Sequence, residues 1–305
     1  MPDATTDALL DLQPETATVD DIDLDLVCEA LHDGEGLVRD RAAALMQIVA
    51  QDAPESALDS LPAIVAGIES DHINVTQKSV ATVVVLTDDH VDELEATVEP
   101  LIGTLHGAVP RTRTFSAKAL SPIAEAHPEW FVPHVETLIT IVAADFDDPL
   151  EGAPDLGEVD DNTAERFQQL SNEEIKQQFL ARATAANLLF EAVKTDPSIG
   201  TDYVDDLLAA DDGSDATVTA AVLDVLAVIG DEDPIAIEGA VEPLLEKLDH
   251  PDEQVRARAV KTLGFSGDDR AVEPLRELAS DDDAGDDLQD LAAQTADWIE
   301  QNTQN

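Results

Sequence analysis

Apolar residues recur along the chain at the spacing that places them on one side of an α-helix. In the segment that begins at Val38, the apolar positions are Val38, Ala42, Leu45, Met46 and Val49. This is the i, i+4, i+7, i+8, i+11 pattern of an amphipathic helix. The pattern predicts a helix with one buried side and one polar side.

The same apolar stripe returns six more times. We call the first residue of each stripe its anchor, and the anchors are Val38, Val75, Thr112, Ala181, Val218, Val255 and Leu288. Successive anchors are 37, 37, 69, 37, 37 and 33 residues apart, and the longest interval equals one 37-residue period plus an insertion of 32 residues. Such regular spacing indicates an internal structural repeat.

A further helical segment precedes each anchor, and several of these segments carry Pro in the first turn, where a missing amide N–H does no harm. Pro62 and Pro133 take this place, and so do Pro100, Pro243 and Pro274 in three near-copies of Val-Glu-Pro-Leu. Two helices per unit predict an all-α protein. We expect a right-handed α-solenoid, an armadillo-like superhelix of about seven two-helix repeats.

Two segments fall outside the repeat. Residues 1–20 are acidic and Thr-rich and predict a flexible N-terminal tail, which leaves 21–301 as a single solenoid domain. The insertion at about 147–171 lies between the two helices of the fourth unit. Its acidic, turn-rich first part predicts an exposed loop. We expect a short helix from Thr163 to Leu170 and then a new helix capped at Ser171.

The second helix of the sixth unit has the pattern V-R-x-x-A-x-x-[AT]-L, from Val255 to Leu263. With this motif the chain resembles HEAT-repeat proteins over roughly 21–301. Its last two units resemble the shorter HEAT-like repeats of phycobilin lyases. The family pattern places Asp three residues before the Val and Arg directly after it, and Asp252, Val255 and Arg256 match it fully.

The arginines at this position are candidates for a structural role. They are Arg39, Arg113, Arg182 and Arg256. They could bind a ligand, but we favour bonds to the backbone or to Asp between repeats. Thr76, Thr219 and Gln289 replace the arginine in three units, and we expect those repeats to lack the bond and to stack more loosely.

The charge balance is extreme, with 67 acidic against 16 basic residues and a formal net charge of -51. The acids are spread along the chain, and 44% of residues are hydrophobic, so a disordered tail does not account for them. Self-repulsion of this size destabilises a compact state unless salt screens it. We therefore predict a source adapted to molar salt, an extreme halophile.

The compartment is predicted from Cys28 and from the N-terminal residues. A lone cysteine allows no intrachain disulfide, which favours an intracellular setting. The first residues carry neither the basic nor the apolar segment of a signal peptide, and the longest apolar run, Val80 to Leu86, is too short to cross a membrane. We expect a cytoplasmic protein without membrane insertion.

The positions three and six residues after each anchor are expected to lie on the concave side of the solenoid. These fourteen positions hold five bases and only one acid, which reverses the balance of the whole chain. We therefore predict that a partner binds there. The candidate contact residues are Arg41, Lys78, Phe115, Lys118, Arg258 and Lys261. The alternative is that these bases pair with acids of neighbouring repeats.

No catalytic or cofactor motif is recognisable. Of the seven histidines, four fall in the turns between paired helices of different repeats and so do not converge on a metal: His32, His72, His106 and His250. Glycine-rich nucleotide loops are absent. The His-Glu pairs of deoxyhypusine hydroxylase, an iron enzyme resembling HEAT proteins, are also absent, and nothing supports lyase activity.

We predict a non-enzymatic scaffold or adaptor that binds one or more proteins on its concave face, without cofactor or metal. The alternatives are a HEAT-like nucleic-acid-binding protein, although nucleic acid is not the expected partner, or an accessory subunit of an enzyme complex. The sequence leaves the oligomeric state open.

Overall fold

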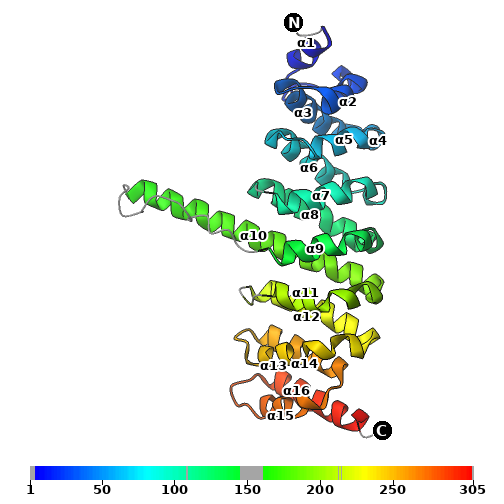
Figure 1. Cartoon of the computed structure of the whole chain (residues 1–305). Coiled ribbons are helices and arrows are strands. Elements are labelled where there is room, and N and C mark those ends of the chain that lie inside the picture. Colours follow the sequence, from blue (N-terminus) through cyan, green and yellow to red (C-terminus); the bar gives the residue numbers. More distant parts are fainter. Residues whose placement is uncertain (1–3, 108, 145–160, 212, 214, 304–305) are drawn as a thin grey trace. The chain divides into compact units, whose positions relative to one another are not determined.

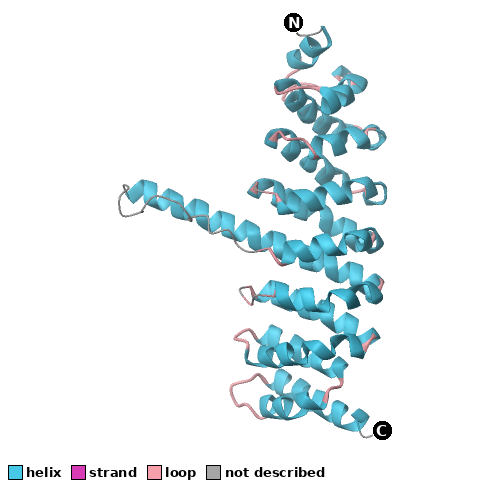
Figure 2. Ribbon diagram, viewed as in Figure 1, coloured by secondary structure: helices cyan, strands magenta, loops and turns pink. Residues whose placement is uncertain are grey.

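A computed structural model describes residues 4–107, 109–144, 161–211, 213 and 215–303. The described residues form α-helices and short 3-10 helices, with no strand among them (Figures 1 and 2). The chain divides into two compact units: unit 1 comprises Met1–Trp130 and Asp148–Ala181, and unit 2 comprises Phe131–Asp147 and Arg182–Asn305. The predicted all-α solenoid class is confirmed, because paired helices stack on the next pair within each unit.

Unit 1 is built from helix pairs that follow the predicted repeat. Its α-helices are α1 (Ala4–Asp11), α2 (Leu24–Asp33), α3 (Leu37–Asp52), α4 (Pro54–Asp59), α5 (Leu61–Ile68), α6 (Ile73–Leu86), α7 (Val98–His106) and α8 (Pro110–Ala126). Its 3-10 helices are η1 (Val19–Asp21), η2 (Val91–Glu93) and η3 (Glu95–Thr97). First helices α2, α5 and α7 pack in one row, and second helices α3, α6 and α8 pack in another.

Unit 2 repeats the same arrangement. Its helices are α9 (Val135–Val142), η6 (Pro197–Tyr203), α11 (Val204–Ala210), α12 (Ala216–Glu232), η7 (Pro234–Ala240), α13 (Val241–Glu246), η8 (Lys247–Asp249), α14 (Glu253–Ser266), η9 (Asp269–Ala271), α15 (Val272–Ala279) and α16 (Asp286–Thr303). Second helices α12, α14 and α16 pack against one another in sequence. Helix η4 (Pro128–His134) and helix α10 (Asp161–Thr195) have residues in both units.

The predicted apolar stripe forms the core of both units. In the second helix of the sixth repeat, Val255, Ala259, Thr262 and Leu263 are all fully buried. The buried threonine keeps its hydroxyl bonded by donating to the carbonyl of Arg258 one turn back, at 2.9 Å. Helix α14 ends at Gly267, which caps it with a positive φ of 60° that suits glycine.

Part of the expected N-terminal tail belongs to the fold. Helix α1 packs against α3 and buries Leu9, which is 1% exposed. The Arg41 guanidinium donates a hydrogen bond to the carbonyl oxygen of Leu12, just after α1 ends. This differs from the flexible tail expected over residues 1–20, because burial of Leu9 against α3 holds the helix to the fold.

The insertion also differs from its prediction. A single helix, α10, runs from Asp161 to Thr195, so the expected short helix and the following helix are continuous. Ser171, the expected cap, lies inside this helix and is buried. Figure 2 shows the N-terminal end of α10 standing clear of the other helices of unit 1. The predicted acidic loop, which forms the first part of the insertion, lies outside the described residues as far as residue 160.

Candidate partner-binding surface

Three of the predicted structural arginines bind backbone carbonyls at the ends of first helices. The acceptors are Leu31 for Arg39, Gly107 for Arg113 and Val142 for Arg182, each 2.7 Å from the arginine Nε. These carbonyls lie in the last turn of α2, at the cap of α7 and at the end of α9, where helices leave acceptors unpaired and their dipole is negative. The arginine therefore ties the second helix of a repeat to its first helix.

Arg256 departs from this arrangement although it matches the family pattern fully. Its Nε has no hydrogen-bond partner among the described residues. Its Nη2 lies 3.8 Å from Glu253 Oε2 on the same helix, which is a loose ion pair. The motif therefore identifies the position of the arginine but does not determine the bond that it makes.

Two repeats without the arginine have a substitute donor, so the expectation that they lack the bond is wrong. Thr76 Oγ1 donates to the carbonyl of Ser70 at 2.8 Å, and Gln289 Nε2 donates to the carbonyl of Asp281 at 2.7 Å. Both acceptors lie just beyond the end of a first helix. In the third such repeat, Thr219 Oγ1 donates to the Asp211 carboxylate at 2.6 Å.

Three predicted contact residues have partners inside the fold. Lys78 Nζ lies 2.6 Å from Asp40 Oδ1, and Arg258 Nε lies 2.8 Å from Asp224 Oδ2. Arg41 donates to the α1 segment, as described above. In both ion pairs the acid comes from the second helix of the preceding repeat. For Lys78 and Arg258 the structure therefore shows the pairing with acids of neighbouring repeats that the sequence left open as the alternative, whereas Arg41 binds a backbone carbonyl.

Phe115 and Lys118 are more accessible to a partner than the three bases that have partners inside the fold. Both lie on α8, where Phe115 is half-buried and Lys118 is exposed. The guanidinium carbon of Arg111 lies 5.4 Å from the centre of the Phe115 ring, so the three side chains share one face of the helix. Within the described residues Lys118 forms no ion pair.

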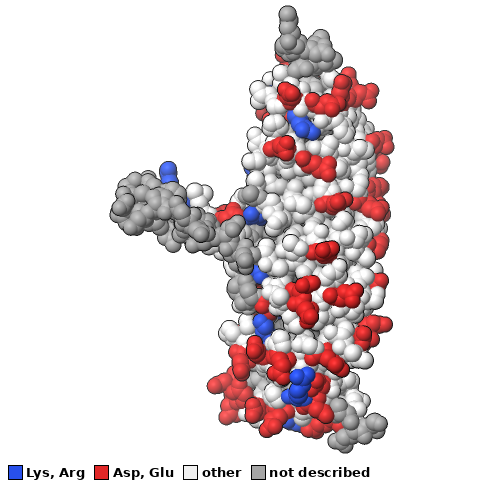
Figure 3. Space-filling view, viewed as in Figure 1, with Lys and Arg blue, Asp and Glu red and all other residues white. Residues whose placement is uncertain are grey.

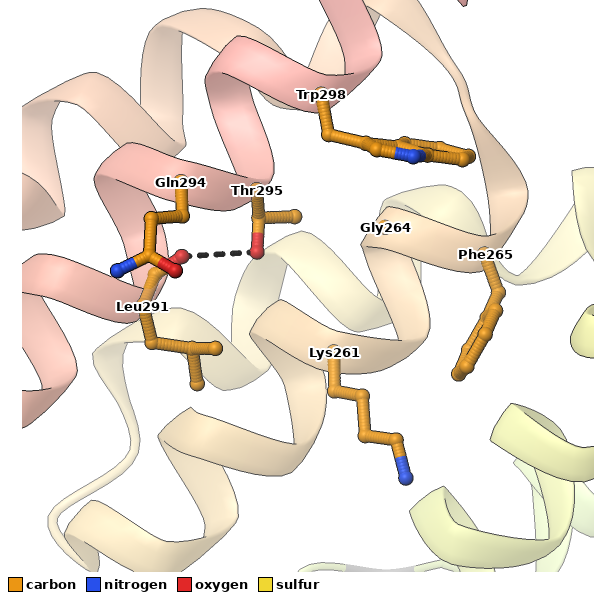
Figure 4. Close-up of a pocket in the computed structure, with 7 residues that line it drawn as sticks. All are labelled: Lys261, Gly264, Phe265, Leu291, Gln294, Thr295 and Trp298. Carbon is orange, nitrogen blue, oxygen red and sulfur yellow. Dashed lines mark hydrogen bonds between the residues drawn. The ribbon is translucent and has the colours of Figure 1, made fainter.

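Lys261 borders a cleft between α14 and α16 of unit 2. The cleft has a volume of about 320 Å³ and is lined by Lys261, Gly264, Phe265, Leu291, Gln294, Thr295 and Trp298 (Figure 4). Figure 4 shows the Trp298 ring on one side of Gly264 and the Phe265 ring on the other. Trp298 is 50% exposed, which is unusual for the largest apolar side chain, and no carboxylate of the described residues lines the cleft.

All residues that line the cleft except Trp298 belong to a segment that matches a known repeat family. Residues 204–296 match the family model of HEAT repeats. A search of curated proteins gives no match to this chain. The matched HEAT repeats run from α11 into α16 and so contain Lys261 and Leu291.

Solved structures with stacked helical repeats are similar to the chain. An engineered protein is 19% identical, covers 99% of this chain and 78% of its own, and superposes with a TM-score of 0.54. A designed armadillo repeat protein is 18% identical, with 80% of this chain and all of its own covered and a TM-score of 0.43. A complex of Kap95 with Nup1 is 14% identical over 96% of this chain and 45% of that chain, with a TM-score of 0.40. The first likeness supports the fold and nothing beyond it.

Phe265 and Trp298, the two aromatic walls of the cleft, were not among the residues predicted from the sequence. Both lie ten residues after an anchor, one turn beyond the positions considered. The same position holds Ile48, Val85, Pro122, Glu191 and Val228 in the other repeats. We call the positions three, six and ten after the anchors the second-helix face. Including the position ten residues after each anchor, one helical turn further along, would have identified the apolar residues of this face.

Acidic residues are rare on this face and common elsewhere. Asp224 and Glu191 are the only acids in its three rows. Of all lysines and arginines, only Lys247, Arg270 and Arg276 lie outside second helices, when α10 is counted as one. Figure 3 shows Asp and Glu side chains recurring along the visible surface while Lys and Arg are few. Most bases therefore lie on the second helices α3, α6, α8, α10 and α14, whereas α12 and α16 carry none.

Two histidine side chains have hydrogen-bond partners in the described part of the fold, His127 and His250, and Nδ1 of His250 accepts from the amide of Asp252 at 3.0 Å. In unit 1, His127 stacks on Trp130 with ring centres 3.9 Å apart and lies 2.8 Å from Asp92 Oδ1 through Nε2. The hydrogen bond to Asp92 raises the pKa of His127. The described residues contain no group of three potential metal ligands, and no described helix has the length and apolar character to span a bilayer.

Proposed function

We propose that this protein is a non-enzymatic scaffold or adaptor that binds a partner protein along its second-helix face. Stacked helix pairs expose a long surface at little cost in core, and protein recognition is the usual role of such solenoids. Because the family match covers only residues 204–296 and the search of curated proteins gives no match from which to infer a role, the proposal depends on the surface itself.

The observation that carries the proposal is the composition of the second-helix face. In a chain with 67 acids and 16 bases, three rows of this face contain Asp224 and Glu191 as their only acids. Most positions in these rows are half-buried or exposed, so the core does not explain why acids are missing. A face that combines bases with half-exposed apolar residues is suited to bury a partner with acidic groups.

The test is affinity capture of partners from a native high-salt lysate, followed by mass spectrometry. The face variant combines Lys118→Glu with Lys261→Glu, since neither lysine forms an ion pair within the described residues. Arg258 is left unchanged because its reversal would also break the bond to Asp224. A matched control combines Arg166→Glu with Lys176→Glu, which changes the net charge equally. Both residues are exposed, form no ion pair within the described residues, and lie on α10 before the anchor Ala181, outside the three rows of the face.

We expect one set of proteins to be captured by the wild type and by the control variant, and lost by the face variant. Equal capture by both variants would contradict the proposal. Treating the lysate with nuclease separates the alternative of a nucleic-acid-binding protein, because captured material that disappears on treatment would be held through nucleic acid.

A further inference from the structure

The cleft between α14 and α16 combines an apolar interior with one cation at its edge. Phe265, Leu291 and Trp298 form its walls, and the missing side chain of Gly264 leaves space between them (Figure 4). A side chain added at Gly264 would approach the Thr295 methyl to 3.0 Å. The volume of about 320 Å³ is enough for one large aliphatic or aromatic side chain.

Lys261 is available for a charged partner. It is exposed, and within the described part of the chain it forms no ion pair. Its Nζ lies 5.8 Å from the centre of the Phe265 ring, so the charge is held beside the apolar wall. By contrast, Arg258 one turn earlier is occupied by Asp224. An open cation next to an open aromatic cleft complements an apolar side chain that is followed or preceded by a carboxylate.

We infer that this cleft receives one large apolar side chain of an acidic peptide segment, whose neighbouring carboxylate pairs with Lys261. The inference rests on the proposed function, because the segment belongs to the partner protein. It also deepens that proposal, since it assigns the recognition chemistry to one place on unit 2. A partner of this kind contributes burial through its apolar residue and selectivity through its acid.

Trp298 can report on the cleft directly by its fluorescence. The chain has two tryptophans, and Trp130→Phe leaves Trp298 as the single one while keeping an aromatic ring beside His127. The probes are acetylated pentapeptide amides in molar KCl: Gly-Glu-Phe-Glu-Gly, one with Ala in place of Phe, and one with Gln in place of both Glu. Their phenylalanine does not interfere with selective tryptophan excitation.

We expect the Phe-Glu peptide to shift the Trp298 emission to shorter wavelength in a saturable way. Replacing its Phe by Ala should weaken binding by at least about tenfold, the effect of losing one buried apolar side chain. Replacing both Glu of the peptide by Gln should also weaken binding. In the Lys261→Gln variant the Glu and Gln peptides should bind equally, while the Phe peptide should still bind more tightly than the Ala peptide. No saturable shift, or equal binding of the Glu and Gln peptides by the wild-type cleft, would overturn the inference.

A second measurement does not depend on the fluorescence. Calorimetry with Trp298→Ala should show loss of Phe-Glu peptide binding, with circular dichroism confirming that the helices are retained. Partner capture that persists in Trp298→Ala but is lost in the Lys118 and Lys261 double variant would overturn the inference and leave the proposed function standing. Absence of any protein captured by the wild type would instead overturn the proposed function.

Discussion

The Nε of Arg182 donates a hydrogen bond to the carbonyl oxygen of Val142 at 2.7 Å, and its Nη2 donates to the carbonyl of Ala210 at 3.2 Å. Arg182 is 3% exposed, and the two carbonyls end the first helices α9 and α11. One buried cation therefore joins the ends of two helices in unit 2. A buried guanidinium of this kind stabilises the fold only while its hydrogen bonds to the carbonyls are kept.

The first prediction concerns this arginine. Arg182→Ala should lower the free energy of unfolding by about 2–4 kcal/mol, because it leaves two buried carbonyls without donors. Arg256→Ala is the matched control and should cost less than about 1 kcal/mol, since Arg256 Nε has no partner among the described residues. Urea unfolding in molar KCl measures both. A larger loss for Arg256→Ala would contradict this assignment.

The repeat could be read from the sequence because burial and residue type agree along second helices. Val75, Val83 and Leu86 are apolar, fully buried and spaced at the helical period. The substitute donors Thr76 and Gln289 could not be predicted in this way. Their bonds depend on where a first helix ends relative to the second, and hydrophobic periodicity does not record that distance.

The candidate site was predicted only in part. Lys118 and Lys261 were identified because a base is conspicuous in an acidic chain, whereas Phe265 and Trp298 were missed because an apolar residue in a helix suggests core. Whether Lys78 faces a partner or Asp40 depends on side-chain placement between repeats, and spacing along one chain cannot distinguish the two. Only the packed structure distinguishes a base that pairs with an acid of a neighbouring repeat from one that is exposed to a partner.

The second prediction concerns the contact between α5 and α6. A Cβ added at Gly67 would overlap Ser79 Oγ and lie 3.1 Å from Ser79 Cβ. Gly67→Ala should therefore destabilise unit 1 by about 1–3 kcal/mol, the usual cost of overpacking. The double variant Gly67→Ala with Ser79→Gly moves the missing side chain to the other helix and should recover most of this loss in urea unfolding.

A second helical glycine provides the control for that experiment. Gly103 in α7 has open space around its Cβ position. Gly103→Ala should raise the free energy of unfolding by about 0.5–1 kcal/mol, because alanine favours the helix. Loss of stability at both glycines would show that close packing is not the cause at Gly67.

The third prediction is a pH dependence centred on His127. The hydrogen bond to Asp92 raises the pKa of His127 above its ordinary value. A raised folded-state pKa means that the stabilisation is complete below the unfolded-state pKa, near about 6.5, and is lost as pH rises through the folded-state value. The melting temperature of the wild type should therefore fall relative to His127→Gln between about pH 6 and 8.

The difference between the two melting curves isolates this residue, because every other titrating group is common to both proteins. A pH titration of the His127 ring by NMR gives an independent measurement of its pKa. A difference curve that rises with pH, or a His127 pKa below the ordinary range, would show that the ion pair with Asp92 does not hold the imidazolium.

The last prediction follows from the net charge of -51. Increasing KCl from about 0.1 M to 1 M shortens the Debye length from about 10 Å to 3 Å and so removes most of the repulsion between surface acids. The melting temperature should rise over this range, and an uncharged osmolyte at equal osmolality should raise it less, because the osmolyte screens no charge. If the protein melts at the same temperature with and without KCl, self-repulsion does not limit its stability and adaptation to molar salt does not explain its acids.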